Sequence, residues 1–537
     1  MTAASLPPVR NVLYIMCDQL RRDYLSCYGH AHLHTPNIDR LAAEGVRFTR
    51  AYTQGTICGP SRMSAYTGRY VSSHQVSWNA VPLPLEELTI GDYLRPAGIR
   101  TALVGKTHAT PNDAALAHVG ADSQKQAQLS EVGFEAYMRH DGIYPDAPIF
   151  ADKRDSAPYT HYLRELGYDG ENPWHTWANA AAGDNGEVLS GWHMRNARLP
   201  ARVAEAHSET VYTTDCAIEF IQAQGESPWC LHLSYIKPHW PYLAPAPYHA
   251  LYDAEHIQLP VRPAVDALSD HPVYAAFRQH QESQNFSRDE VRLNVVPTYM
   301  GLIKQVDDQL GRLIEVLERS GRWNDTLIVF TSDHGDFLGD HYLGEKEFLL
   351  EQAVGVPLIV RDPRAAADAT RGTVEHRLAE TIDALPTFLE ALGLPSAQHR
   401  LEGRSLIPLL HGQPVAWRNY AIAEYDYAFQ APARERLGQP IDRCRMTMVR
   451  SDRWKYLAYD GFRPQLFDLE NDPHEHHDLG ADPAYAAVRE QHLGYLFDWM
   501  RGLKRRTTIS HEEVEDRARR FRYGEPESAR MVPIGVW

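Results

Sequence analysis

The chain has 537 residues, of which 43% are hydrophobic and 10% aromatic, which is the composition of a globular protein with a substantial core. Its length suits one large domain with a smaller one, or two to three domains of ordinary size. With 54 basic and 70 acidic residues the net charge is −16. This balance argues against broad binding to nucleic acid or to an anionic membrane, because both depend on clustered positive charge. An anionic substrate would therefore need positive charge concentrated in a pocket.

The cysteine pattern and the N-terminal residues indicate in which cellular compartment the protein is expected. Six scattered cysteines without a Cys-x-x-Cys pair indicate neither a disulfide framework nor a zinc or redox motif. The first residues lack the basic and apolar regions of a signal peptide, and no apolar run is long enough to span a bilayer. We expect a reduced, cytoplasmic protein without a membrane segment.

The first predicted strand is a continuous apolar run over residues 12–17, as expected of a strand covered on both faces of a mostly parallel sheet. Asp18 and Gln19 follow it directly. In open α/β sheets ligands gather at the carboxyl ends of strands, so polar residues at such an end are candidates for a site.

Two short helices and a second strand come next. Thr35-Pro36 predicts the start of the first helix, with Thr35 as its N-cap, and Gly45 is placed to end it. The second helix spans residues 89–98, with Thr89 as its cap. The strand over 101–104 then runs into Gly105-Lys106-Thr107-His108.

From about residue 110 to 200 the periodicity is lost among Gly, Asn, Asp, His and Trp. We predict a long irregular insertion there, lying over the site.

Strands and helices alternate again from residue 208. Helices are predicted near 208–224 and over 303–317, and strands over 230–236, 326–330 and 356–360. His239 follows the first of these strands, and Asp333 and His334 follow the second. Residues 1–412 are therefore predicted to form an α/β domain, with a large doubly wound mixed sheet flanked by helices.

The pattern changes beyond residue 412. Short strand-like segments and one helix near 482–502 predict a small α+β domain over 413–504. Residues 505–537 are a charged tail with an apolar tip, which we expect to dock on a neighbouring subunit of a dimer or tetramer.

Two polar clusters are assigned to structure rather than to chemistry. Asp307 and Asp308 lie on the polar side of an amphipathic helix, where solvation is expected. The tract His474-Glu-His-His477 resembles a metal-binding sequence, but it follows an Asp-Pro turn and is expected to be solvated.

The most distinctive local sequence is Cys58-Gly-Pro-Ser-Arg62, which opens a helical segment that closes at Gly68. By itself it fits an ordinary loop-to-helix junction with Cys58 as a small buried hydrophobe. The polar residues at the predicted strand ends change this interpretation.

Four strand ends supply side chains that a parallel sheet would bring to one edge. They are Asp18 and Gln19, Lys106 and His108, His239, and Asp333 and His334. Two aspartates, an amide oxygen and a histidine suit a hard cation such as Ca²⁺, Mg²⁺ or Mn²⁺. Each residue also has an ordinary explanation as a cap, a loop histidine or a solvated lysine, but their joint occurrence favours a site.

With these residues the chain resembles the sulfatases of the alkaline phosphatase superfamily over nearly its whole length. The matching segments are Asp18-Gln19, Cys58 to Arg62 with Thr67-Gly-Arg69, Gly105 to His108, Lys237-Pro-His239, Ser332 to Gly335, and Lys346. Asp-Gln at the first strand end, Lys-Pro-His-Trp-Pro and Trp78-Asn79 are most similar to the group of phosphonate monoester hydrolases and related bacterial arylsulfatases. The resemblance implies an alkaline phosphatase-like fold.

The resemblance also implies a modified nucleophile. In the family, the cysteine at the position of Cys58 is oxidised by a separate formylglycine-generating maturation enzyme. The hydrated aldehyde is a diol that takes up the ester as a covalent sulfo-enzyme intermediate and releases it by breaking its own carbon–oxygen bond.

Roles carried over by position follow from the same resemblance. Asp18, Gln19, Asp333, His334 and the modified Cys58 would hold one divalent metal, with Ca²⁺ favoured over Mn²⁺ or Mg²⁺. Arg62 would hold the diol. Lys106 and Lys346 would bind the sulfuryl or phosphoryl oxygens, and Asn79 would contact the substrate.

Two histidines and one lysine complete the set implied by the resemblance. His239, with Lys346, would protonate the leaving alcohol and contact the substrate. His108 would be the base that collapses the covalent intermediate.

The resemblance also bears on the substrate. Phosphonate monoester hydrolases tend to carry Tyr and Thr where this chain has Lys106 and His108, a pair shared with sulfatases. We therefore expect hydrolysis of aryl or alkyl sulfate monoesters, small anionic substrates. The alternatives are a phosphonate monoester or phosphodiester hydrolase on the same scaffold, or an inactive relative that binds anions or metal.

Overall fold

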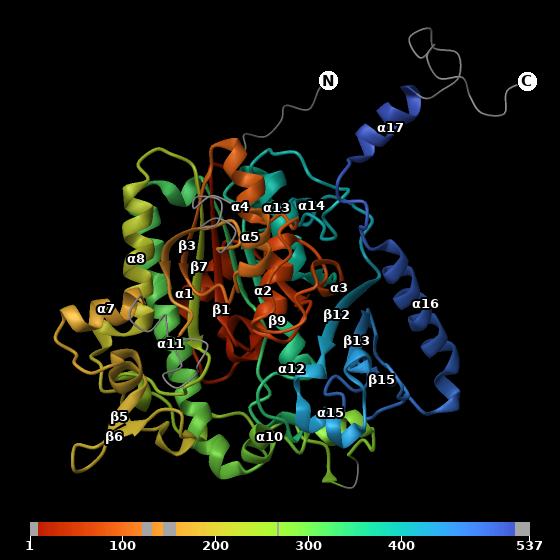
Figure 1. Cartoon of the computed structure of the whole chain (residues 1–537). Coiled ribbons are helices and arrows are strands. Elements are labelled where there is room, and N and C mark those ends of the chain that lie inside the picture. The colour runs from red at the N-terminus through yellow and green to blue at the C-terminus, as the bar shows by residue number, and fades with distance from the viewer. Residues whose placement is uncertain (1–8, 121–130, 143–156, 266–267, 521–537) are drawn as a thin grey trace, which may run out of the picture.

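A nine-stranded mixed sheet runs through the larger part of the molecule (Figure 1). The computed structural model describes residues 9–120, 131–142, 157–265 and 268–520. The strands are β1 (Asn11–Asp18), β2 (Val46–Tyr52), β3 (Arg100–Gly105), β4 (Glu135–Arg139), β7 (Trp229–Pro238), β8 (Thr326–Ser332), β9 (Gly355–Arg361), β10 (Thr373–Glu375) and β11 (Ala379–Glu380). Their order is β10-β2-β9-β8-β1-β7-β3-β4, with β11 also paired to β2.

Only β9 among these strands runs against its neighbours, since it pairs antiparallel with both β8 and β2. The other pairings are parallel. The carboxyl ends of β8, β1, β7 and β3 therefore lie side by side at one edge. The predicted mixed α/β sheet is confirmed.

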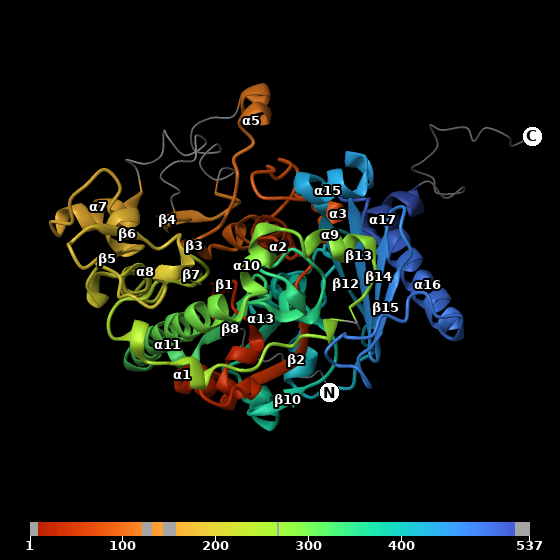
Figure 2. The ribbon, with the colours of Figure 1, turned by 90° about the horizontal axis from the view of Figure 1, so that it is seen from below.

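Helices cover both faces of the sheet. One face packs against α1 (Pro36–Ala43), α8 (Glu209–Ala223) and α11 (Asp289–Arg319). The other packs against α2 (Cys58–Thr67), α4 (Ile90–Leu94), α13 (Ala384–Ala391) and α14 (Ile407–Leu410). Figure 2 shows α1 and α11 on one side of β1 and β8, with α13 on the other.

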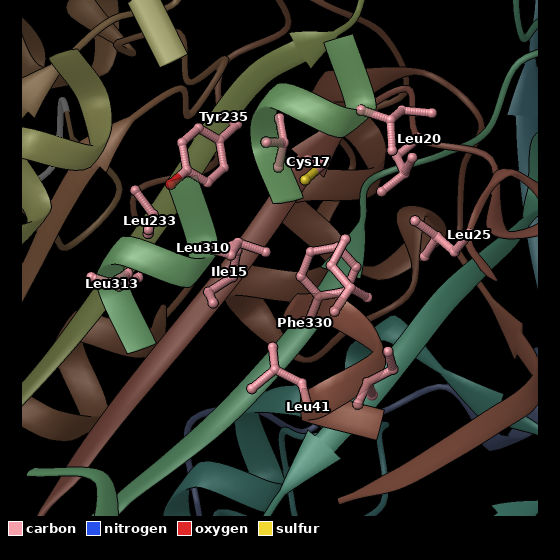
Figure 3. Packing of buried hydrophobic residues seen from close by; sticks show 14 of the residues in the cluster. Ile15, Cys17, Leu20, Leu25, Leu41, Leu233, Tyr235, Leu310, Leu313 and Phe330 are labelled. Carbon is pink, nitrogen blue, oxygen red and sulfur yellow. The ribbon is translucent and has the colours of Figure 1, made fainter. Parts of the chain in front are cut away.

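The central strand β1 shows why its sequence is apolar without alternation. Ile15 and Cys17 enter the cluster formed with α1 and α11, whereas Tyr14 and Met16 enter the cluster on the opposite face. Successive side chains of a strand point to opposite faces, so a strand covered twice must be apolar at every position. Figure 3 shows the first cluster, in which Ile15 lies among side chains of neighbouring strands and α11.

The smaller C-terminal part is an antiparallel sheet with a long helix along its outer side (Figures 1 and 2). Its strands are β12 (Tyr420–Asp426), β13 (Arg445–Ser451), β14 (Trp454–Tyr459) and β15 (Gln465–Asp468), and its helices are α15 (Ala431–Leu437), α16 (Ala486–Gly502) and, beyond them, α17 (His511–Arg520). The predicted α+β character is confirmed. The boundary predicted at residue 412 falls between α14 and β12. The tip of the predicted docking tail, 521–537, lies outside the described residues.

The segment predicted to be irregular, 110–200, contains regular elements. They are α5 (Asp113–Val119), β4, α7 (Pro158–Glu165) and the hairpin of β5 (Ala180–Ala182) and β6 (Val188–Ser190). β4 belongs to the main sheet, where it pairs in parallel with β3. It is an edge strand with charged residues at both ends, so its sequence has no apolar run. Residues 121–130 and 143–156 lie outside the described part.

Further short helices lie between these elements. They are α3 (Val71–His74), α9 (Pro272–Phe277), α10 (Gln281–Phe286) and α12 (Glu351–Val354). In the part of the chain that the structure describes, none of the helices is both long enough and apolar enough for a membrane span.

The ends of α1 differ from the prediction. Thr35 makes no side-chain cap, and the buried carboxylate of Asp307 on α11 accepts from the backbone N–H groups of Asn37 (3.0 Å) and Ile38 (2.9 Å) instead. The expected solvation of Asp307 is therefore wrong. Gly45 does not end α1 by a left-handed turn. A Cβ there would lie 2.5 Å from Val360 O, so glycine permits close packing on β9.

The predicted solvated turn at 474–477 is also anchored in part. His474 and His477 are exposed, but Glu475 is buried and pairs with the buried Lys455 at 2.7 Å. The carboxylate thus joins this turn to β14.

Candidate active site

The predicted site residues converge at the edge formed by the carboxyl ends of β8, β1, β7 and β3. Asp18 is the last residue of β1, and Asp333 follows β8 directly. Lys106 follows β3, and His239 follows β7. These positions are brought together because the four strands are parallel neighbours.

Cys58 lies at the centre of this group, at the first residue of α2, and is 1% exposed. Its Sγ atom is 3.2 Å from His334 Nε2, 3.4 Å from Lys346 Nζ and 3.9 Å from Lys106 Nζ. Burial alone would raise the pKa of the thiol, but Lys106, Lys346 and His334 together lower it well below its usual value. The environment therefore stabilises negative charge at this position.

Four buried side chains could hold a cation. Ligand atoms of Asp18, Cys58, Asp333 and His334 all lie within 4.8 Å of one another. His334 Nδ1 donates to Gly335 O at 2.9 Å, which directs Nε2 toward the carboxylates of Asp18 and Asp333. Burial and the neighbouring Asp18 carboxylate raise the pKa of Asp333, a repulsion that a divalent cation would relieve. The donor set fits a metal ion.

The amide of Gln19 is oriented for the same site. Its Nε2 donates to Asp336 Oδ2 at 2.6 Å and to Tyr242 OH at 3.4 Å, and its Oε1 accepts from Lys346 Nζ at 3.0 Å. The amide oxygen of Gln19 therefore faces the ammonium group of Lys346. Asp336 and Tyr242 were not predicted as site residues. Asp336 stands three residues after Asp333, which was the available signal, whereas nothing in the sequence singled out Tyr242.

Arg62 is completely buried and ties the carboxylates together. Its Nε atom donates to Asp333 Oδ2 at 2.9 Å, and one terminal nitrogen donates to Asp18 Oδ2 at 3.3 Å. The other donates to Lys106 O at 2.9 Å and to Ser234 Oγ at 2.8 Å. Among the described residues these contacts hold the frame of the site, and the expectation that Arg62 binds the diol stays a prediction.

His239 and Lys346 form a pair beside Cys58. His239 Nδ1 donates to Trp240 O at 2.6 Å, and its Nε2 accepts from Lys346 Nζ at 3.2 Å. Burial, reinforced by Lys346 and Lys106, lowers the pKa of His239 to about 4 against the opposing effect of Asp18. The imidazole is therefore neutral at pH 7, and the proton shared by the pair resides on Lys346.

His108 and Asn79 line the same cavity. His108 Nδ1 is buried and has no hydrogen-bond partner in the described part of the chain. Asn79 Oδ1 accepts from the backbone N–H of Gly59 at 2.8 Å, which leaves its amide nitrogen to donate elsewhere. A Cβ on Gly59 would meet Asn79 Oδ1 at 3.0 Å and Trp78 O at 3.2 Å, so glycine permits this approach.

A cavity of about 220 Å³ opens above Cys58. Cys58, Lys346, His108 and His239 line its reactive end, and aromatic rings and carboxylates line much of the rest. A small anionic group could thus reach the basic residues while its substituent rests among the rings.

Residues 10–394 match the model of the sulfatase family, and residues 339–499 match the C-terminal model of N-sulphoglucosamine sulphohydrolase. The chain belongs to the sulfatase family.

Among sulfatase-family relatives, the multifunctional alkaline phosphatase superfamily protein PehA of Trinickia caryophylli is 32% identical over 91% of this chain and 95% of its own length. The phosphonate monoester hydrolase SpPMH of Silicibacter pomeroyi is 29% identical, with a TM-score of 0.79 over 94% of this chain and 98% of the other. The phosphonate monoester hydrolase of Agrobacterium radiobacter is 28% identical, with a TM-score of 0.77 over 91% and 95%. The predicted resemblance and fold are therefore confirmed.

Proposed function

We propose that this chain hydrolyses phosphonate monoesters and phosphodiesters, with sulfate monoesters as a second substrate class. The observation that carries the proposal is the position of Cys58, which contacts two lysines and a buried cluster of cation ligands at the strand edge. The order of the two classes differs from that expected from the sequence. The structural similarity to the two phosphonate monoester hydrolases of Silicibacter pomeroyi and Agrobacterium radiobacter supports the change.

Two further groups, a modified Cys58 and a bound metal ion, would complete the chemistry. Formylglycine at Cys58 would supply a hydrated aldehyde as the nucleophile. A divalent metal held by Asp18, Gln19, Asp333 and His334 would neutralise ester oxygens and favour ionisation of the attacking hydroxyl. Conversion of Cys58 to formylglycine requires a formylglycine-generating enzyme as a partner.

The lysines bind and orient the anionic end of the substrate in this proposal. Lys106 Nζ and Lys346 Nζ stand 3.9 Å and 3.4 Å from Cys58 Sγ, close enough to contact oxygens of a group attached there. Preorganised positive charge of this kind stabilises charge that develops at the reacting centre. The amide nitrogen of Asn79 donates to the same group.

Proton movement is assigned to the neighbouring pair and to His108. Lys346 Nζ donates the proton to the leaving alcohol oxygen, and the neutral His239, fixed by Trp240 O, orients that lysine. His108, whose Nδ1 is unpaired among the described residues, accepts the proton released when the covalent intermediate collapses.

A specific observation favours sulfate monoesters as the second class. Lys106 and His108 are the residues at which phosphonate monoester hydrolases tend to carry Tyr and Thr, and Lys106 contacts Cys58 here. A sulfate monoester has three unshared oxygens to place among cations, one more than a phosphonate monoester.

The test uses protein coexpressed with a formylglycine-generating enzyme and matched 4-nitrophenyl esters of sulfate, phenylphosphonate and a phosphodiester. Mass spectrometry of the peptide containing Cys58 establishes the extent of modification. We expect turnover of all three esters, fastest with the phosphonate or the phosphodiester.

The control variants separate the nucleophile from other cysteines. Cys58→Ala should abolish turnover, whereas Cys444→Ala, at a buried cysteine of the C-terminal part, should retain it. Modified protein that cleaves none of the esters, or a Cys58→Ala variant of full activity, would contradict the proposal.

A further inference from the structure

The cavity above Cys58 carries opposite charges in different parts of its wall. Lys346 is the one lysine or arginine among the described residues that line it, and it points to Cys58. Three glutamates, Glu282, Glu345 and Glu347, line the same cavity. The lining therefore holds more carboxylates than lysine or arginine side chains to pair with them.

Two of these carboxylates are sheltered from solvent. The side chain of Glu345 is 15% exposed, and that of Glu347 is 22% exposed. Glu345 accepts from Trp240 Nε1 at 2.8 Å and lies 4.0 Å from Lys346 Nζ, while Glu347 has His280 Nδ1 at 3.6 Å. Burial and the neighbouring Asp336 raise the pKa of Glu345 to about 8 against the opposing effect of Lys346, and a cationic ligand beside Glu345 and Glu347 offsets the cost of keeping both side chains ionised.

Aromatic side chains line the cavity together with the carboxylates. Trp78, Trp240 and Phe277 contribute to the wall. Trp78 is stacked on Phe429 with ring centroids 5.3 Å apart, and Phe277 packs against Phe348 at 5.7 Å, so both rings are held in place by neighbours. Rigid aromatic rings attract an ammonium group through their negative faces.

We propose that the alcohol released by this enzyme carries a positive charge. The substrate class is then a zwitterionic ester, with its anionic phosphonate, phosphodiester or sulfate group at Cys58 and its ammonium group among Glu345, Glu347 and the aromatic rings. This inference rests on the proposed hydrolytic function and specifies its leaving group. Hydrolysis consumes one water, breaks the ester bond and leaves a hydroxyl group on the ammonium-bearing alcohol.

The test uses two methylphosphonate monoesters of the same shape. One is the ester of 2-(trimethylammonio)ethanol, and the other is the ester of 3,3-dimethylbutanol, in which carbon replaces the charged nitrogen. Binding of each to the full-length, metal-loaded Cys58→Ala variant is measured by calorimetry, so the result does not depend on turnover. We expect the cationic ester to bind about tenfold more tightly or better.

A second variant assigns the selectivity to the acidic wall. Adding Glu347→Gln should lower the ratio of the two affinities by about fivefold, because it removes a sheltered charge and keeps the side chain's shape. Glu490→Gln on the exposed side of α16 makes the same change of net charge away from the cavity and should leave the ratio unaltered.

Equal affinities, tighter binding of the neutral ester, or no binding of either would overturn the inference, whatever Glu347→Gln does. Equal affinities would mean that the carboxylates only repel anionic leaving groups. Failure of the proposed function is seen separately, because it appears as absent turnover of 4-nitrophenyl phenylphosphonate by the matured wild-type protein.

Discussion

Arg62 allows the electrostatic frame of the site to be tested apart from catalysis. Its guanidinium forms ion pairs with Asp333 at 2.9 Å and with Asp18 at 3.3 Å, and all three side chains are fully buried. The change Arg62→Met keeps much of the side chain's length and removes its charge. In this variant Lys106, 2.5 Å from Asp18, still pairs with the Asp18 carboxylate. The Asp333 carboxylate, which loses its ion pair with Arg62, is therefore the group most affected.

The size of the effect follows from the uncompensated carboxylate. Removing one partner of a buried ion pair costs about 3–5 kcal/mol, since a buried charge is left unpaired. In a chain of this length, a loss of about 4 kcal/mol lowers Tm by roughly 4 °C if unfolding is cooperative. A divalent cation bound at the same carboxylates should restore part of that loss, because it supplies the missing positive charge.

The assay is thermal unfolding of the wild-type protein and Arg62→Met, followed by circular dichroism in EDTA and then with Ca²⁺ or Mn²⁺. We expect a larger difference in Tm between the two proteins in EDTA than with metal. Arg517→Met, which removes a solvent-exposed pair with Glu513 on α17, should change Tm by less than about 1 °C. An Arg62→Met protein with unchanged Tm in EDTA would refute the reasoning.

Three further predictions concern positions around this frame. Gly59→Ala should lower kcat/KM by about tenfold with little loss of stability, because its Cβ would displace Asn79; an unchanged kcat/KM measured with a 4-nitrophenyl ester would show that Asn79 is not needed in place. Burial lowers the pKa of His74 to about 3, so the folded protein keeps it neutral while the unfolded chain binds a proton below about pH 6.5. The stability that neutral His74 contributes is present above pH 6.5 and is lost as the pH falls, by about 1.4 kcal/mol per pH unit. In His74→Gln, the unfolding free energy measured with urea should therefore fall less steeply between pH 6.5 and 5, by that amount per pH unit. Parallel pH profiles of the two proteins would contradict the prediction. Asp307→Ala should lower the unfolding free energy by about 1–3 kcal/mol, because α1 loses its cap, while kcat is retained. Asp308→Ala, at a side chain 37% exposed, should lower the unfolding free energy by less. Equal losses in the two variants would argue against the cap.

The elements with strong periodicity were predictable from the sequence. β1 is apolar at every position because both of its faces are covered, and α11 shows a stripe at intervals of three and four residues because one side packs on the sheet. β4 and β12 were not predicted. β4 has no apolar run, because its place at the sheet edge leaves part of it exposed.

The candidate site was predictable to the extent that its residues stand at strand ends. Asp18, Lys106, His239 and Asp333 each follow an apolar run, and parallel strands place such positions at one edge whatever the loops between them do. Cys58 was found by its local sequence, and its surroundings agree with a site.

The burial pattern of each strongly periodic element, and the polar residues that follow its strands, can thus be read from local sequence. Which side chains meet across the chain depends on the folded structure. Asp336 and Tyr242 orient Gln19, Asp307 caps α1, and glutamates share a cavity wall with aromatic rings. Periodicity reports whether a residue's own position is buried, whereas these contacts join residues far apart in the chain and depend on which strands and loops become neighbours.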